Sequence, residues 1–164
     1  MKKTIAITFA LSLPVFLAAC SNVGTVQNKW CDPAQPEQIT LSADALFAFD
    51  RSSMSDLLPE GRRTLDELAH KLTTGYATID AINLTGHTDR LGNGDYNMRL
   101  GKARANTVRH YLIQRGVRAP ILTATAGATK PITTSCNGDI PSAELKECLA
   151  PDRRVTVDIL GARK

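Results

Sequence analysis

The sequence predicts a single α/β domain in which helices pack on one mixed β-sheet. Its 164 residues, 43% of them apolar, are enough for one domain with its own hydrophobic core. From about residue 39 to residue 160, apolar patterns typical of strands alternate with patterns typical of helices. We find no internal repeat, low-complexity tract or second domain within that alternation.

The first half of this region predicts a strand followed by a helix. Residues 39–49 form a strand-like apolar stretch, and Asp50 stands just beyond its end. Pro59 suits the first position of a helix, because its missing N–H would have no partner there in any case. Leu68 and Leu72 then follow at helical spacing, so we expect one face of this helix to be buried.

The second half predicts one more helix and the remaining strands. A short strand over 81–84 leads through a polar turn into a helix over about 98–115, which Gly116 would cap. Residues 121–126 and 155–160 form the last two strands, joined by a loop, and the final strand alternates apolar and polar side chains. Parallel neighbours in such an order are joined by right-handed crossovers.

The first 19 residues have the features of an export signal. Lys2 and Lys3 precede an apolar run over 4–17, and small residues then lead to Cys20. At about fourteen residues the run is too short to span a bilayer, which needs roughly twenty. A buried core helix is the alternative, but the lysines and the small residues at its end fit that alternative poorly.

Leu-Ala-Ala-Cys at residues 17–20 resembles the lipobox of bacterial lipoproteins. The resemblance implies a signal peptide over 1–19 and a lipidated Cys20, and Ser21 after it resembles a signal for outer-membrane sorting. A diacylglycerol and an amide-linked acyl chain together would anchor the protein permanently, whereas one chain anchors only marginally. The polar residues 20–40 would then be a tether, and the domain would occupy 41–164.

Charge and cysteine content restrict the function further. Lys and Arg number 20 against 16 Asp and Glu, whereas nucleic-acid binders are usually far more basic and cluster their charge. Of the four cysteines, Cys136 and Cys148 enclose a short loop that closes easily, so we expect them to form a disulfide in an oxidising compartment. Cys31 is left over. No histidine has metal-ligand spacing with a cysteine, and we expect neither a metal nor a cofactor.

The polar turn LTGHTDRLGNGDYN at residues 84–97 could be a phosphate cradle, a catalyst or a receptor. The phosphate-binding Gly-x-x-x-x-Gly-Lys motif does not occur, and Asn97 replaces the third glycine of a dinucleotide fingerprint. There is no Gly-x-Ser-x-Gly nucleophile elbow, and the spacing of His87 and Asp89 does not force an acid–base contact. A receptor is therefore the favoured interpretation.

Arg104 is the most informative residue of the second helix. It falls within an apolar stripe made of Leu100, Ala103, Thr107, Val108, Tyr111 and Leu112. A buried guanidinium needs a carboxylate from the protein or from a ligand, unless its methylenes pack while its head reaches water. Asp89 lies just past the second strand, so both can meet at the sheet end where α/β proteins commonly bind ligands. Such a pair suits a zwitterion, because the carboxylate takes an ammonium and the guanidinium a carboxylate.

Several motifs resemble the peptidoglycan-binding domain of the OmpA/Pal/MotB family, over about residues 41–160. They are Gly86-His87-Thr88-Asp89, Tyr96-Asn97, Leu100, Arg104-Ala105, Val108, Tyr111-Leu112 and Asp152-Arg153-Arg154-Val155. From Cys136 through Val155 the sequence resembles the OmpA carboxy-terminal domain itself, including its disulfide. The resemblance implies an OmpA-like β-α-β-α-β-β mixed sheet.

The family resemblance also implies a function and site residues. The protein would be a non-enzymatic outer-membrane lipoprotein that faces the periplasm and ties the membrane to peptidoglycan. Asp89 and Arg104 would bind the amino-acid end of diaminopimelate in the stem peptide, Asn97 would add polar contacts, and Asp50 matches the Asp that ends the family's first strand. Gly101 replaces the family's usual Ser, which would remove a side-chain cap.

Two other functions remain open. The protein could belong to an envelope machine for secretion, motility or division, in which wall binding only positions a surface for other envelope proteins. It could also be a wall-remodelling hydrolase. We further expect the glycines of the turn to let the backbone approach the ligand closely.

Overall fold

The computed structural model describes residues 36–164. The expected signal peptide over 1–19, Cys20, Cys31 and the tether up to residue 35 lie outside the described residues. Within 36–164, no helix combines the length and apolar character needed to cross a membrane.

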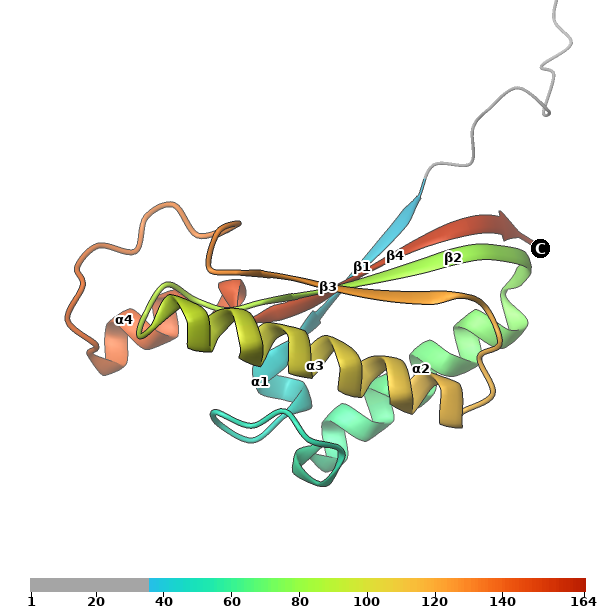
Figure 1. Cartoon of the computed structure of the whole chain (residues 1–164), viewed down its shortest axis with the longest axis horizontal. Helices are drawn as coiled ribbons and strands as arrows, with labels where there is room; N and C mark the ends of the chain where they lie inside the picture. The colour runs from blue at the N-terminus through green and yellow to red at the C-terminus, as the bar shows by residue number, and fades with distance from the viewer. Residues whose placement is uncertain (1–35) are drawn as a thin grey trace, which may run out of the picture. The chain divides into compact units, whose positions relative to one another are not determined.

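A four-stranded mixed sheet in the order β1-β4-β2-β3 is the frame of the domain (Figure 1). Its strands are β1 (Glu37–Ser42), β2 (Tyr76–His87), β3 (Ile121–Gly127) and β4 (Arg154–Arg163). β2 and β3 run parallel, whereas β4 is antiparallel to both β1 and β2. The predicted α/β domain with a mixed sheet is confirmed.

The helices α2 (Pro59–Thr74) and α3 (Gly94–Gln114) cover one face of the sheet (Figure 1). Pro59 occupies the start of α2 as predicted. Asn93 caps α3, because its side-chain oxygen accepts a hydrogen bond of 2.9 Å from the backbone N–H of Tyr96. This cap makes the helix begin at Gly94 rather than at about residue 98. The predicted stop is confirmed by Gly116, whose φ of 88° suits a left-handed cap.

The core lies between this sheet face and the helices. Its members include Leu41, Leu46, Phe47, Leu65, Ile82, Leu84, Val108, Leu112, Val155, Val157 and Ile159. The strand register brings them together, since Leu84 pairs with Val157 and Ile82 with Ile159 on the same face. Each such side chain contributes roughly 1.5–3 kcal/mol when fully buried.

The expected first strand is wrong beyond Ser42. The chain turns there into the short helix α1 (Ala43–Leu46), and the Ser42 hydroxyl accepts from the backbone N–H of Ala45. Ala43 and Leu46 are buried on one side of that turn, which a strand would not achieve. Asp50 therefore does not end a strand; it lies between α1 and the 3-10 turn η1 (Met54–Asp56).

Two other boundaries also differ from the prediction. β1 begins at Glu37, which pairs with Ile159, so residues 37–40 belong to the sheet rather than to a tether. β2 is longer than the predicted 81–84, because it pairs with β4 from Tyr76 to His87.

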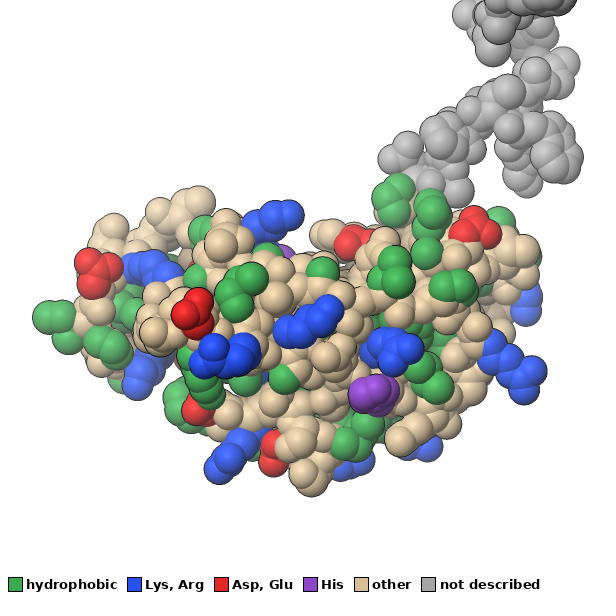
Figure 2. Space-filling view, in the orientation of Figure 1, with side chains coloured by type: hydrophobic (Ala, Val, Ile, Leu, Met, Phe, Trp, Pro, Cys, Tyr) green, Lys and Arg blue, Asp and Glu red, His purple; other side chains and the backbone are tan. Residues whose placement is uncertain are grey.

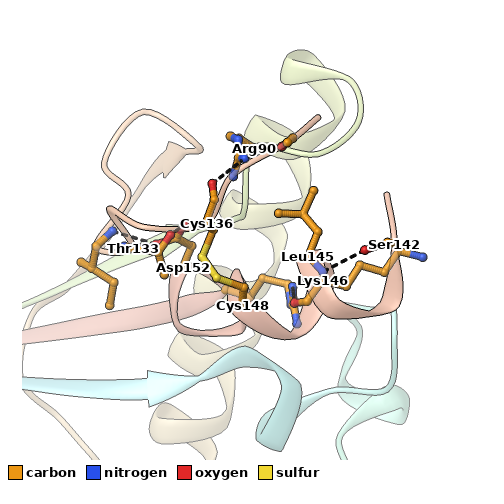
Figure 3. The surroundings of a disulfide bond; sticks show 11 residues. Arg90, Thr133, Cys136, Ser142, Leu145, Lys146, Cys148 and Asp152 are labelled. Carbon is orange, nitrogen blue, oxygen red and sulfur yellow. Dashed lines mark hydrogen bonds between the residues drawn. A yellow bond between two sulfur atoms is a disulfide. The ribbon is translucent and has the colours of Figure 1, made fainter. Parts of the chain in front are cut away.

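The connection between β3 and β4 is not the plain loop that we expected. It contains the helix α4 (Ala143–Cys148), capped by the Ser142 hydroxyl, and the 3-10 turn η2 (Ala150–Asp152). The expected disulfide joins Cys136 to Cys148, with a Cα–Cα distance of 5.7 Å (Figure 3). The buried Asp152, near the end of the connection, accepts backbone N–H bonds of 2.7 Å from Ile132 and 3.0 Å from Thr133 near its start.

Candidate functional site

A cavity of about 320 Å³ lies where β2 ends and α3 begins. All four residues that the sequence singled out for ligand binding line it, namely Asp50, Asp89, Asn97 and Arg104. Asp44 from α1, Lys146 from α4 and Arg153, which directly precedes β4, complete its charged lining. The cavity is thus built by elements that are far apart in the sequence.

The turn after β2 is held by hydrogen bonds within itself and from α3. The backbone N–H of Leu91 donates to Asp89 Oδ1 at 2.9 Å. The buried Asn97 donates through Nδ2 to the carbonyl oxygens of Asp89 at 3.2 Å and Leu91 at 2.9 Å. At the start of the turn, the N–H of Thr88 donates to the Gly127 carbonyl at 3.0 Å. Asn97 therefore positions the backbone that carries Asp89.

Asp89 also has a side-chain partner that the sequence analysis missed. Arg153 donates through Nη1 to Asp89 Oδ2 at 2.8 Å, and the Asp89 side chain is only 14% exposed. The same guanidinium forms a two-pronged contact with Asp44, in which Nη2 lies 2.7 Å from Oδ2 and Nε lies 3.0 Å from Oδ1. Hydrogen bonds to Asp44 and, to a smaller extent, to Asp89 raise the pKa of Arg153 above its usual value. Arg153 stands in the Asp-Arg-Arg-Val motif, but only the fold shows its partners.

Arg104 is buried, with 3% of its surface exposed, and it lines the cavity rather than extending into open solvent. Its Nε donates to the Arg51 carbonyl at 2.9 Å, and its guanidinium lies 5.7 Å from the centre of the Phe47 ring. Among residues 36–164, no carboxylate oxygen lies within 4.0 Å of it. Burial lowers the pKa of Arg104, although a guanidinium stays protonated in proteins. The cavity wall therefore contains a buried cation without a directly bonded anion.

Asp50 and two aromatic residues form the outer part of the cavity. Tyr96 donates its hydroxyl to Asp50 Oδ1 at 2.6 Å, and this bond raises the pKa of Tyr96. Asp50 has a φ of 57°, a left-handed conformation that Asp tolerates better than most residues. Phe49, which is 85% exposed, also lines the cavity. Asp50 thus presents a carboxylate at the rim.

The expectation that glycines of the turn approach the ligand is wrong for Gly86. A Cβ at Gly86 would lie 1.9 Å from the carbonyl oxygen of Gly101 in α3, so the two glycines let helix and strand pack closely. Gly101 lies inside α3 rather than at its start, so no cap is lost there.

The buried face of α3 also differs from the predicted apolar stripe. Gly101 and Ala105 are buried, while Leu100 and Ala103 are only partly buried.

His87 does not form an acid–base pair with Asp89. It is 4% exposed, and its Nε2 lies 3.4 Å from Thr156 Oγ1 on the neighbouring strand β4. Burial lowers the pKa of His87 to about 4, and the positive charges of Arg154 and Lys130 act in the same direction. The ring is therefore neutral at pH 7.

The disulfide loop contributes part of the cavity wall through Pro141 and Lys146. Arg90, from the turn after β2, donates to the carbonyl oxygen of Cys136 at 2.9 Å (Figure 3). It also donates to the carbonyl oxygen of Gly138 at 2.6 Å. Arg153 donates to the Lys146 carbonyl at 3.0 Å through the same Nη1 that bonds Asp89. No motif in the sequence marked Lys146 or Asp44, because their place depends on how distant elements meet.

On the face drawn in Figure 2, the Lys and Arg side chains are spread over the surface, with acidic and neutral residues between them. The charged groups of the cavity are also of both signs. The site thus offers carboxylates and cations together, an arrangement that suits a ligand carrying both charges.

The sequence matches the OmpA family over residues 46–141. It is 39% identical over 129 residues to outer membrane protein A of Shimwellia blattae, and the match covers 77% of this chain and 52% of that protein. The chain thus spans about half the length of that curated relative, and 37% of the corresponding Salmonella typhi protein.

Two solved structures are similar in fold and 25% identical in sequence. The cell wall anchor of the T6SS from Pseudomonas aeruginosa matches with a TM-score of 0.58, over 77% of this chain and 82% of that one. The peptidoglycan-associated lipoprotein from Burkholderia pseudomallei matches with a TM-score of 0.53, over 73% of this chain and 88% of that one.

Proposed function

The chain belongs to the OmpA family, and we propose that it binds the diaminopimelate-containing stem peptide of peptidoglycan without catalysing a reaction. The single observation that carries this proposal is the buried guanidinium of Arg104, which lines the same cavity as Asp89 and has no carboxylate within 4.0 Å among residues 36–164. Two similar structures support it, since one is named a peptidoglycan-associated lipoprotein and the other a cell wall anchor.

In this proposal each charged end of the ligand has its own partner. Arg104 binds the carboxylate at the free amino-acid end of diaminopimelate, because a guanidinium binds a carboxylate in a two-pronged way. Asp89 and Asp50 bind the ammonium. Asp89 can still accept hydrogen bonds from the ammonium, because an ionised carboxylate has about four acceptor sites and the protein uses only some of them. Asn97 holds the turn and adds polar contacts.

We further propose that Cys20 carries the lipid and anchors the protein in the outer membrane, with the domain in the periplasm. A tether over residues 20–36 would reach at most about 60 Å when fully extended. The protein would then link the outer membrane to the wall. Cell fractionation of a Cys20→Ala variant tests the anchor: the unlipidated protein should leave the outer-membrane fraction. A variant that stays there without acylation would refute lipid anchoring.

Co-sedimentation of the full chain, solubilised in detergent, with diaminopimelate-type sacculi tests wall binding. The wild-type protein should pellet with the wall, whereas Arg104→Gln should bind roughly ten- to a hundredfold more weakly, because a charge-assisted bond is left unmade. Arg109→Gln is the matched control, since Arg109 also lies on α3 and donates to a carbonyl, that of Ile121, but does not line the cavity. Equal loss in both variants, or release of soluble wall fragments by the wild type, would contradict the proposal.

A role in an envelope machine is the second candidate, favoured by the similarity to a secretion-system wall anchor. Wall binding would then serve to position other envelope proteins. Arg104→Gln should fail to complement a deletion strain under either candidate, because both need wall binding. Specific co-purification of other envelope proteins with the detergent-solubilised wild-type chain would favour the machine, whereas its absence would favour the tether.

A further inference from the structure

The disulfide loop is fixed in place as a wall of the cavity. Cys136 and Cys148 are covalently joined, Arg90 bonds the loop through two carbonyl oxygens, and Arg153 bonds the carbonyl of Lys146. Arg90 lies in the turn after β2 and Arg153 directly precedes β4, and both of these regions also line the site. Lys146 therefore lines the cavity from a defined position.

The charges of the cavity are paired unequally. Asp44 and Asp89 share Arg153, and Asp50 accepts from Tyr96. In the part of the chain from 36 to 164, neither Arg104 nor Lys146 has a carboxylate within 4.0 Å. Two cations of the lining thus remain without a directly bonded anion, one buried and one exposed.

Resting on the proposed function, we propose that Lys146 binds a second carboxylate of the stem peptide. The zwitterionic end of diaminopimelate supplies one carboxylate, which Arg104 binds. Diaminopimelate has another carboxyl group at its opposite end, within the peptide chain. Where the stem ends at this residue, that second carboxyl is free and charged, and Lys146 is the remaining cation of the site. The site would then bind the terminal main-chain carboxylate of the stem peptide as well as the zwitterionic end of the diaminopimelate side chain.

The exposure of Lys146 limits the size of the effect. An exposed ion pair contributes little to the free energy of binding. We therefore expect the stem with a free main-chain carboxylate to bind only roughly two- to fivefold more tightly than one without that charge. The preference should shrink as salt is added, because exposed charges are screened. Lys146→Gln removes the charge but keeps the backbone carbonyl that Arg153 bonds, so the wall of the cavity should stay in place.

Calorimetry on the full chain in detergent tests this with two synthetic stem peptides that end at diaminopimelate. One has its main-chain carboxyl free and the other has it amidated, while the zwitterionic end is the same in both. The wild type should prefer the free acid, and Lys146→Gln should bind both equally. Lys130→Gln is the matched control, because Lys130 is an exposed lysine of the same connection that does not line the cavity.

The outcomes separate this inference from the function on which it rests. Equal affinity of the wild type for both peptides, or a preference that survives in Lys146→Gln, would overturn the role of Lys146 while leaving wall binding intact. A preference that is lost in Lys130→Gln would also overturn it. Failure of the wild type to bind either peptide would instead remove the proposed function, and this inference with it.

Discussion

Arg153 and Asp89 are directly paired, with the guanidinium Nη1 donating to the carboxylate Oδ2 at 2.8 Å. Asp89, which we propose binds the ammonium of the ligand, is therefore already paired with a cation of the protein itself. This pairing has two consequences. It fixes the direction of the Asp89 carboxylate before any ligand arrives, and it makes Asp89 matter for folding as well as for binding.

Replacing Asp89 should therefore affect stability in a graded way. Asp89→Ala should lower the free energy of unfolding by about 1–3 kcal/mol, because Arg153 and the N–H of Leu91 both lose an acceptor. Asp89→Asn should cost less, since its amide oxygen can still accept one of these bonds. Urea denaturation of both variants measures the difference. An equal loss in both would show that the charge of the carboxylate is what stabilises the fold, and no loss in either would contradict a stabilising role for the contacts of Asp89.

The disulfide should contribute both to stability and to binding. Replacing Cys136 and Cys148 by Ser should lower the free energy of unfolding by about 2–4 kcal/mol, because the cross-link limits the entropy of the unfolded chain. Affinity for sacculi should also fall, because the loop supplies Pro141 and Lys146 to the cavity wall. Denaturation and co-sedimentation measure the two effects. Peptide mapping that finds either cysteine joined to Cys31 would contradict the pairing.

Close packing of α3 on β2 predicts opposite results for two glycines. Gly86→Ala should destabilise the domain by about 1–3 kcal/mol or more, because its Cβ would meet the Gly101 carbonyl at 1.9 Å. Gly94→Ala is the control, since no atom lies within 4 Å of a Cβ there and Ala favours a helix. Thermal unfolding compares them. A tolerated Gly86→Ala would mean that the helix does not lie this close to the strand.

Burial of His87 predicts a loss of stability in mild acid. Its pKa falls from an ordinary value of 6.5 to about 4 in the folded protein, so the unfolded chain binds more protons between these values. The stabilisation is complete above pH 6.5 and is lost as pH falls to 4, by on the order of 3 kcal/mol. Glu37, whose pKa is about 2, contributes mainly below this window.

A pH series of denaturation curves tests this prediction. His87→Gln should flatten the dependence between pH 6.5 and 4, while His110→Gln, at an exposed position, should leave it unchanged. If the free energy of unfolding has the same pH dependence in His87→Gln and in the wild type, groups other than His87 cause the acid sensitivity.

The order of helices and strands could be predicted because it depends on local periodicity and caps. Pro59 and Gly116 mark helix ends for reasons that act within a few residues. The turn of the chain after Ser42 was missed, because Ala43 to Phe49 is apolar enough for either a strand or a helix. Only its packing against the rest of the core decides between them.

The site was predicted in part for a similar reason. Arg104 was found because a cation broke an apolar stripe, and Asp89 because it follows a strand. Asp44, Lys146 and Arg153 come from three other elements, and their meeting depends on how the sheet and the disulfide loop are assembled. The roles of Gly86 and Gly101 likewise arise from contact between two elements, not from the turn itself.

The most direct test of the account is calorimetry of the full chain with soluble muropeptides that carry either diaminopimelate or lysine. Lysine offers the ammonium without the carboxylate, so the wild type should bind the diaminopimelate form roughly ten- to a hundredfold more tightly. Arg104→Gln should lose most of that preference, whereas Asp89→Asn should weaken binding to both forms. Equal affinity of the wild type for the two muropeptides would contradict the proposed role of Arg104.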